Sequence, residues 1–185
     1  MTTPNLGSPN PARPLILGIA ITLALLLTTV VYLPGLAGPY FTDDYPNILS
    51  NPMVAMRDLS ADSVVAAARS NTSGPLGRPL PALSFGLNYY WAGKSFEPSG
   101  FKAVNLFWHV FNAILVLLFV RAVLRLSGAA TGKSLELTSM VVALIWALHP
   151  LHLTNVLYVV QRMNSMAATF VLLGLIAFVA GRSRF

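Results

Sequence analysis

Apolar residues are concentrated in four long stretches of the chain, and polar residues are concentrated between them. A helix needs ~20 mainly apolar residues to cross the ~30 Å hydrocarbon core of a bilayer. An isolated strand would leave its backbone polar groups unsatisfied in lipid, so each stretch is predicted to be a helix. The pattern predicts an all-α integral membrane helical bundle with about four transmembrane helices, at residues 15–35, 103–121, 134–149 and 163–181.

The first apolar stretch has two interpretations. It could be the core of a cleaved signal peptide, because small residues such as Gly35 and Ala37 follow it. The apolar region of a signal peptide is usually ~7–15 residues long, which is shorter than this stretch, so an uncleaved anchor is favoured. Residues 1–14 are predicted to form a disordered cytoplasmic tail, and residues 15–185 a single transmembrane domain.

The segment between the first two spans, residues 38–102, is predicted to be a long, ordered outer loop. Loops of this length usually carry function or are disordered, and this one is too apolar for disorder. Leu59–Arg69 predicts a short surface helix with Ser60 as its N-cap and Leu59, Val64, Val65 and Ala68 on one face. An aromatic belt is expected to lead back into the membrane at Phe85, Tyr89, Tyr90, Trp91, Phe96 and Phe101.

The charges that flank the spans predict the orientation of the bundle. Lys and Arg in short flanking segments tend to stay cytoplasmic. The outer loop at 38–102 holds equal numbers of basic and acidic residues, whereas the other flanks are basic. Both termini are therefore predicted to be cytoplasmic in a multi-pass protein of a bacterial inner (plasma) membrane. The basic residues on the cytoplasmic flanks are Arg13, Arg121, Arg125, Lys133, Arg182 and Arg184.

Composition narrows the function classes further. The 185 residues are 55% apolar and 10% charged, whereas soluble domains contain about a quarter charged residues. A soluble enzyme, a disordered chain and a coiled coil are thereby excluded. The net charge of +6 is scattered between apolar stretches, so it does not form the footprint of a nucleic-acid-binding protein. The absence of Cys excludes disulfides, thiolate metal sites and cysteine nucleophiles.

The candidate chemistry lies just after the first span, at Asp43 and Asp44. Two adjacent carboxylates near the lipid boundary could supply a general base and an oxygen ligand for a divalent cation. A solvated acidic turn is the alternative for so short a motif.

Polar residues within the predicted spans form a second group. Asn105, His109 and Asn112 share one helix face and are expected to point into the bundle. Hydrogen bonds between helices are favoured for them, and contact with a sugar or an ion is the alternative. His149 and His152 flank the point where Pro150 is expected to end the third helix. The spacing of the three His residues fits no compact metal-binding motif.

Two arginines are candidate ligands of a lipid phosphate. Arg162 opens the fourth span on the predicted outer side, and its planar guanidinium could bind a phosphate through paired hydrogen bonds. Arg78 is the second candidate, and a headgroup anchor is the alternative for Arg162. The other cations of the outer loop are interpreted as solvated or as headgroup contacts: Arg57, Arg69, Lys94 and Lys102.

Several motifs together resemble one known family. The sequence TDDYPNILSNP at 42–52 resembles the first outer loop of the membrane O-mannosyltransferases that carry tetratricopeptide repeats, and of their bacterial relatives in the GT-C glycosyltransferase superfamily. Further motifs similar to this family follow in the same order. They are RPL at 78–80, LSF at 83–85, LNY at 87–89, GF at 100–101 with Asn105, His109 and Asn112, HPLH at 149–152 and YVVQRM at 158–163.

The resemblance implies an enzyme that moves a sugar from a polyprenyl-phosphate carrier to an acceptor hydroxyl of a protein or glycan on the outer face. The family's catalytic or metal-associated acid would be Asp43 or Asp44. Eukaryotic relatives commonly have Thr-Glu where this chain has Leu153 and Thr154, so one carboxylate is missing. Such enzymes have more spans than this chain, which would be their N-terminal portion, joined by further transmembrane segments or a partner subunit. The alternative is a non-catalytic membrane scaffold, or a subunit of a split or truncated glycosyltransferase.

Overall fold

The computed structural model describes residues 12–71 and 77–182, and every regular element in these ranges is a helix. The predicted all-α fold class is confirmed for this part of the chain. Residues 1–11, which include most of the predicted N-terminal tail, lie outside the described residues.

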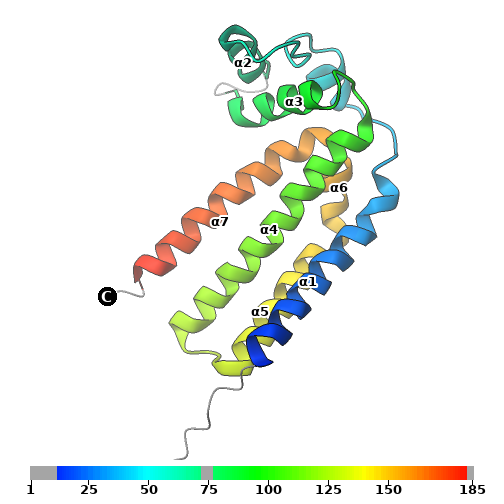
Figure 1. Cartoon of the computed structure of the whole chain (residues 1–185). Coiled ribbons are helices and arrows are strands. Elements are labelled where there is room, and N and C mark those ends of the chain that lie inside the picture. The colour runs from blue at the N-terminus through cyan, green and yellow to red at the C-terminus, as the bar shows by residue number, and fades with distance from the viewer. Residues whose placement is uncertain (1–11, 72–76, 183–185) are drawn as a thin grey trace, which may run out of the picture.

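Four long helices form the body of the molecule and lie roughly side by side (Figure 1). Three of these helices, or four if the bent pair after α4 counts as one span, are long and apolar enough to cross a membrane. The chain is therefore a multi-pass membrane protein. The four helices are α1 (Ala12–Tyr32), α4 (Pro98–Ser127), α5 (Gly132–Ala147) and α7 (Arg162–Arg182).

Helix α4 is the centre of the bundle and packs against both α5 and α7. It has 30 residues and runs beyond both ends of the predicted span. At 1.5 Å per residue it is about 45 Å long, so its ends extend past the ~30 Å hydrocarbon core. Pro98 suits its first turn, where a missing N–H costs no hydrogen bond. Gly128, in the left-handed conformation with φ 68°, ends it.

The third span is broken at Pro150, as the sequence predicts. Helix α5 ends at Ala147, and a short 3-10 helix, η3 (Pro150–His152), leads into α6 (Leu153–Leu157). The two parts are bent by 51°. A second 3-10 helix, η4 (Val159–Gln161), then joins α6 to α7. The turn at residues 158–161 therefore lies at the start of α7, next to the upper end of α4 (Figure 1).

The long loop between α1 and α4 folds into a helical cap over one end of the bundle (Figure 1). Its helices are η1 (Leu33–Gly35), η2 (Tyr45–Leu49), α2 (Ala61–Ala68) and α3 (Pro79–Trp91). Ser60 caps α2 by accepting a hydrogen bond from the Ser63 amide, which confirms the predicted N-cap.

The predicted apolar face of α2 is wrong in part, because Leu59 and Val65 are about half exposed. Ala67 is the buried residue of this helix, and it packs against Gly86 of α3. A Cβ atom at Gly86 would come within 2.9 Å of the Ala67 methyl group, so glycine is what allows α2 and α3 to approach.

The aromatic residues of the loop do not all form the predicted belt. Phe85 and Phe101 are 1% and 0% exposed and lie in the main apolar core of the cap, whereas Trp91 is 70% exposed. Tyr89 and Phe96 are partly buried and pack against the same core. Burying a whole aromatic ring stabilises a fold strongly, and these buried rings build the cap and join it to α4 and α7. The buried members are Tyr40, Ile48, Val54, Phe85, Phe101, Val159 and Met163.

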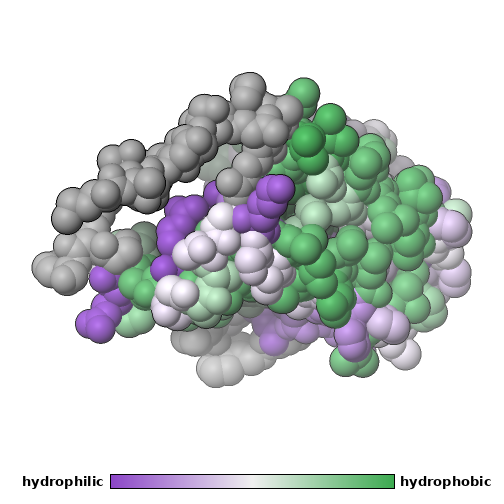
Figure 2. All heavy atoms as spheres, turned by 90° about the horizontal axis from the view of Figure 1, so that it is seen from below, coloured by the Kyte–Doolittle hydropathy of each residue, from purple (hydrophilic) through white to green (hydrophobic). Residues whose placement is uncertain are grey.

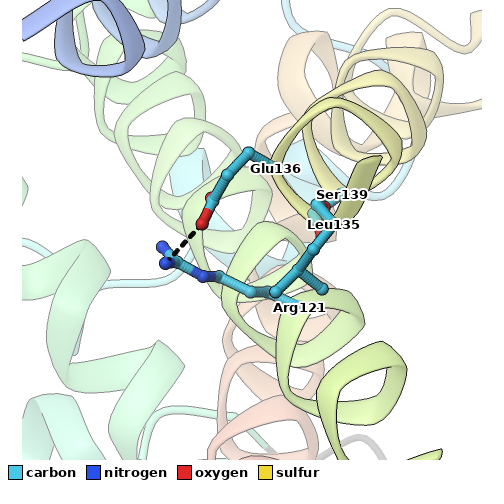
Figure 3. Close-up of polar contacts among 4 residues, drawn as sticks. All are labelled: Arg121, Leu135, Glu136 and Ser139. Atoms are coloured by element: carbon cyan, nitrogen blue, oxygen red, sulfur yellow. Dashed lines mark hydrogen bonds and ion pairs between the residues drawn. The ribbon is translucent and has the colours of Figure 1, made fainter. Parts of the chain in front are cut away.

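At the opposite end, an ion pair links α4 to α5. The Arg121 guanidinium lies 2.6 Å from the Glu136 carboxylate (Figure 3). One turn after Glu136 in α5, the Ser139 hydroxyl donates to the Leu135 carbonyl. Seen from this end, the surface has broad hydrophobic areas with separate hydrophilic clusters (Figure 2). Such a distribution is that of a bundle with lipid-facing sides and a polar end.

Candidate functional site

The two adjacent acids after α1 lie in opposite environments. Asp43 is exposed, whereas Asp44 is completely buried. They stand at the start of η2, where the chain leaves the upper end of α1 and contacts the turn before α7. The structure therefore separates two residues that the sequence treats as a pair.

Asp44 holds the loop to the turn before α7. Its carboxylate accepts hydrogen bonds from the amides of Phe41 (3.0 Å), Val160 (2.7 Å) and Val159 (3.4 Å). Burial raises the pKa of Asp44 above its ordinary value, and the three amide donors and the nearby Lys102 charge oppose that rise. With its oxygens occupied by backbone donors, Asp44 acts as a structural link between distant segments.

Asp43 presents its carboxylate to solvent while its backbone is held in place. The Asp43 amide donates to the Tyr158 hydroxyl at 2.9 Å, and the Asp43 carbonyl accepts from the Asn47 side chain at 2.8 Å. The Tyr158 hydroxyl also bonds the Thr42 hydroxyl at 3.1 Å. An exposed carboxylate on a fixed backbone can accept a proton from a bound hydroxyl, which is what a general base requires.

Arg162 is fully buried at the first position of α7 and uses all of its donors within the protein. Nε donates to Asn105 Oδ1 at 2.8 Å, and Nη2 donates to Asn88 Oδ1 and to the Phe101 carbonyl. Nη1 donates to the carbonyl and hydroxyl of Ser84. The guanidinium also stacks 4.6 Å from the Phe85 ring centroid. In this arrangement Arg162 joins α3, α4 and α7, and its predicted phosphate contact stays a prediction.

Lys102 is buried as well, which makes its interpretation as a solvated or headgroup residue wrong. It is 1% exposed, and Nζ donates to the carbonyls of Gly38 (2.7 Å) and Pro39 (2.9 Å). The ammonium lies 5.6 Å from the centroid of the Phe41 ring. The burial of Lys102 was not predicted from the sequence, because a lysine just before an apolar stretch is usually placed at the membrane surface.

A groove of about 470 Å³ lies beside these residues. Its walls come from the loop after α1, the start of α4 and helix α6, and most of the lining atoms are apolar. The polar side chains in the lining are those of Lys102, Thr42 and Tyr158, and the last two are hydrogen-bonded to each other. Asp43 directly follows Thr42, so its carboxylate belongs to the same part of the loop. The other lining residues are Gly35, Gly38, Phe41, Leu153, Thr154 and Leu157.

Arg78 lies at the N-cap of α3, away from that groove. It is exposed, and Nη1 contacts the Met163 sulfur at 3.1 Å. It lines a separate groove of about 380 Å³ together with residues of α3 and α7. The structure therefore does not bring Arg78 and Lys102 into one pocket.

The polar face of α4 forms hydrogen bonds between helices. Asn105 Nδ2 donates to the carbonyls of Tyr158 and Val159, and Asn112 Nδ2 donates to the carbonyl of Ser165 on α7. His109 Nε2 lies 2.8 Å from the Ala147 carbonyl at the end of α5. All three polar side chains are buried, and each links α4 to a different part of the bundle.

The His residues near the helix break form an aromatic cluster. His152 lies 5.2 Å from His109 and 4.3 Å from Trp146, measured between ring centroids. His149 caps η3 by accepting from the Leu151 amide. Within the described residues, no three His, Asp or Glu side chains are placed to hold a metal ion. With the Asp44 oxygens occupied by amides, the acid pair does not fit a divalent cation.

Comparison with known proteins relates the chain to one group of membrane enzymes. It is 32% identical to human protein O-mannosyl-transferase TMTC4 over 155 residues, which is 76% of this chain and 20% of that protein. It is 30% identical to Drosophila melanogaster Tmtc2 over 158 residues (83% and 16%), and 29% identical to human TMTC1 over 184 residues (93% and 20%). The chain thus spans between about a sixth and a fifth of the length of these relatives. No family model and no solved structure matches it.

Proposed function

The chain is homologous to the N-terminal part of the TMTC protein O-mannosyl-transferases, which are GT-C membrane enzymes, and we propose that it is the N-terminal part of a glycosyltransferase. The donor is a sugar on a polyprenyl-phosphate carrier, and the acceptor is a hydroxyl of a protein or glycan. Further transmembrane segments or a partner subunit complete the enzyme.

The observation that carries this proposal is the exposed residue Asp43, which directly follows the groove-lining residue Thr42. In the proposed reaction Asp43 accepts the proton of the acceptor hydroxyl as that oxygen attacks the anomeric carbon of the sugar. The bond from the sugar to the carrier phosphate breaks, and the lipid phosphate leaves as an anion. Asp44 holds the loop that presents Asp43 and takes no proton.

A cation near the departing phosphate would stabilise its charge. Cationic side chains that bond across the junction of the cap and the bundle include Arg78, Lys102 and Arg162. Every N–H group of Arg162 already has a partner, so we assign it to the frame of the site. Arg78 and Lys102 are the candidates that remain for the phosphate.

Exchange of each Asp for Asn separates the roles of the two acids. Asn is nearly the same shape as Asp but cannot accept a proton at neutral pH. We expect Asp43→Asn to lower the rate of sugar transfer by the complete enzyme ~10²–10⁴-fold, as loss of a general base does, with unchanged thermal stability. Asp44→Asn should lower thermal stability, because an amide cannot accept all of its present hydrogen bonds as well as a carboxylate.

Asp62→Asn is the matched control, because Asp62 is an exposed acid on α2, remote from the groove. It should leave both transfer and stability unchanged. Full transfer by Asp43→Asn would end this proposal and would leave a non-catalytic membrane scaffold, or a subunit of a split enzyme, as the function.

A further inference from the structure

One hydroxyl group, that of Tyr158, holds the backbone of Asp43 from a remote segment of the chain. It accepts a hydrogen bond from the Asp43 amide at 2.9 Å and bonds the Thr42 hydroxyl at 3.1 Å, across 115 and 116 residues of sequence. The bond to the Asp43 carbonyl comes from the Asn47 side chain, which is only four residues away. Tyr158 therefore fixes where residues 42 and 43 stand relative to the bundle.

Asp44 anchors the same stretch of the loop in the opposite direction. Its carboxylate belongs to the loop and accepts from the Val159 and Val160 amides of the turn before α7. The Tyr158 hydroxyl belongs to that turn and accepts from the loop amide of Asp43. Asp44 is completely buried, whereas the hydrogen bonds of the Tyr158 hydroxyl are exposed and Tyr158 lines the groove. Tyr158 is therefore the anchor that stands beside the proposed reaction.

The backbone of Tyr158 is itself held at both ends. Its amide donates to the Thr154 carbonyl at 3.0 Å, and its carbonyl accepts from Asn105 Nδ2 at 3.1 Å. Asn105 Oδ1 in turn accepts from Arg162 Nε at 2.8 Å. The buried network around Arg162 thus supports the residue whose hydroxyl reaches Asp43.

The position of the Asp43 backbone decides what its carboxylate can reach. A general base must come within about 2.6–3.2 Å of the atom whose proton it takes. A misplacement of about 1 Å can lower the rate of a catalysed reaction about 100-fold. Because an aspartate side chain is short, it cannot compensate for a backbone that moves. A hydroxyl that fixes the Asp43 amide therefore controls whether the carboxylate is in place.

We propose that Tyr158 is a positioning residue for sugar transfer, whose hydroxyl keeps Asp43 in place to accept the proton of the acceptor. The assignment rests on the proposed function, in which Asp43 is the general base. Tyr158 takes no proton itself and acts through the Asp43 amide. Loss of its hydroxyl should therefore slow the chemical step without weakening the binding of the donor.

The test exchanges Tyr158 for Phe in the complete enzyme, which removes the hydroxyl and keeps the ring. The donor is a short-chain polyprenyl-phosphate mannose, because the relatives are named O-mannosyl-transferases, and the acceptor is a serine-rich peptide. We expect kcat to fall about 10- to 100-fold with an unchanged KM for the donor.

Tyr90→Phe is the matched control, because Tyr90 lies on α3 and does not line the groove. It should keep the kcat and the KM of the wild type. A wild-type kcat in Tyr158→Phe, or a higher KM at an unchanged kcat, would overturn the proposal.

A double variant distinguishes positioning from a general structural effect. Asp43→Asn leaves no base to position, so adding Tyr158→Phe to it should lower the rate no further. If Tyr158 only stabilised the fold, its loss would slow the wild type and Asp43→Asn by the same factor. Equal losses in the two backgrounds would therefore overturn the proposal.

Hydrogen–deuterium exchange reports the position of the loop without any activity. The Asp43 amide should exchange faster in Tyr158→Phe than in the wild type, because it loses its acceptor. Exchange along α4 should stay unchanged, which shows that the variant is folded. An unchanged exchange rate at Asp43 would contradict the proposed contact.

The two proposals fail in different ways. Slow transfer by Asp43→Asn together with a wild-type kcat in Tyr158→Phe would keep Asp43 as the base and remove the role of Tyr158. Full transfer by Asp43→Asn would end the proposed function, and the positioning role would end with it.

Discussion

Two identical side chains in adjacent positions, Asp43 and Asp44, have different roles because of contacts made far along the chain. Two of the three amides that hold Asp44 belong to Val159 and Val160, which lie 115 and 116 residues away in sequence. The acid pair could be predicted as the candidate site from sequence. Its division into an exposed and a buried member could not, because that depends on where the turn before α7 meets the loop.

Arg162 provides a prediction at the same scale. Arg162→Lys keeps the charge but replaces five fixed donors with three on a flexible stem, so at least two of the five acceptors lose their partner. Hydrogen bonds to charged groups contribute ~1.5–3 kcal/mol each, so we expect the free energy of unfolding to fall by several kcal/mol. Thermal unfolding in detergent micelles or bicelles measures the loss.

Arg182→Lys is the control, because this exposed arginine ends the same helix. It should leave the unfolding temperature unchanged. A stable Arg162→Lys protein that bound farnesyl phosphate weakly would contradict the structural role and restore Arg162 as the predicted phosphate ligand.

At the scale of single elements, the local signals in the sequence were the dependable ones. Apolar stretches predicted the long helices, Pro150 predicted the helix break, and Ser60 predicted the start of α2. The position of Phe85 and Phe101 in the core was not predictable from the aromatic pattern, because an aromatic ring suits a membrane interface and a core equally well. Tertiary packing decides between them.

The N-terminus of α2 predicts a dependence on pH. The exposed Asp58 carboxylate accepts hydrogen bonds from the Ser60 hydroxyl, the Ser63 hydroxyl and the Ser60 amide. These bonds, with the Ser60 hydroxyl first, lower the pKa of Asp58 from 3.8 to about 2. A lowered pKa in the folded state means that this stabilisation is complete above about pH 4 and is lost as the pH falls through about 2.

NMR of the ¹³C-labelled Asp58 carboxyl group should show a titration with a midpoint near pH 2. Below that pH, the amides of α2 should exchange faster with solvent. Ser60→Ala should move the midpoint back toward 3.8, because it removes the leading donor. An unshifted midpoint in the wild type would show that the three hydrogen bonds do not persist in solution.

At the scale of the whole molecule, the cap and its groove lie at one end of the bundle, and the described chain begins and ends at the other (Figure 1). The sequence anticipated this arrangement, since an even number of spans returns the chain to its starting side. It did not anticipate that Lys102 would be enclosed where the loop, α4 and α6 meet. Such a site depends on three segments that are remote in sequence, so no local pattern marks it.

The two ends of α4 test the sidedness of this arrangement. Ser95 precedes α4 on the cap side and Ser127 is its last residue, and both are exposed. Because α4 is one continuous helix of about 45 Å, a membrane-spanning α4 puts these residues on opposite sides. Basic residues gather at the Ser127 end, namely Arg121, Arg125 and Lys133, so we expect that end to be cytoplasmic and Ser95 to face outward.

Single cysteines measure this directly, because the chain has none of its own. In intact cells, Ser95→Cys should react with a membrane-impermeant thiol reagent, and Ser127→Cys should react only after the membrane is permeabilised. The reverse pattern would put the cap and Asp43 in the cytoplasm, where an acceptor on the outer face could not reach them. Labelling of both positions in intact cells would mean that α4 does not span the membrane, and the groove beside Lys102 would then lose its access to a lipid carrier.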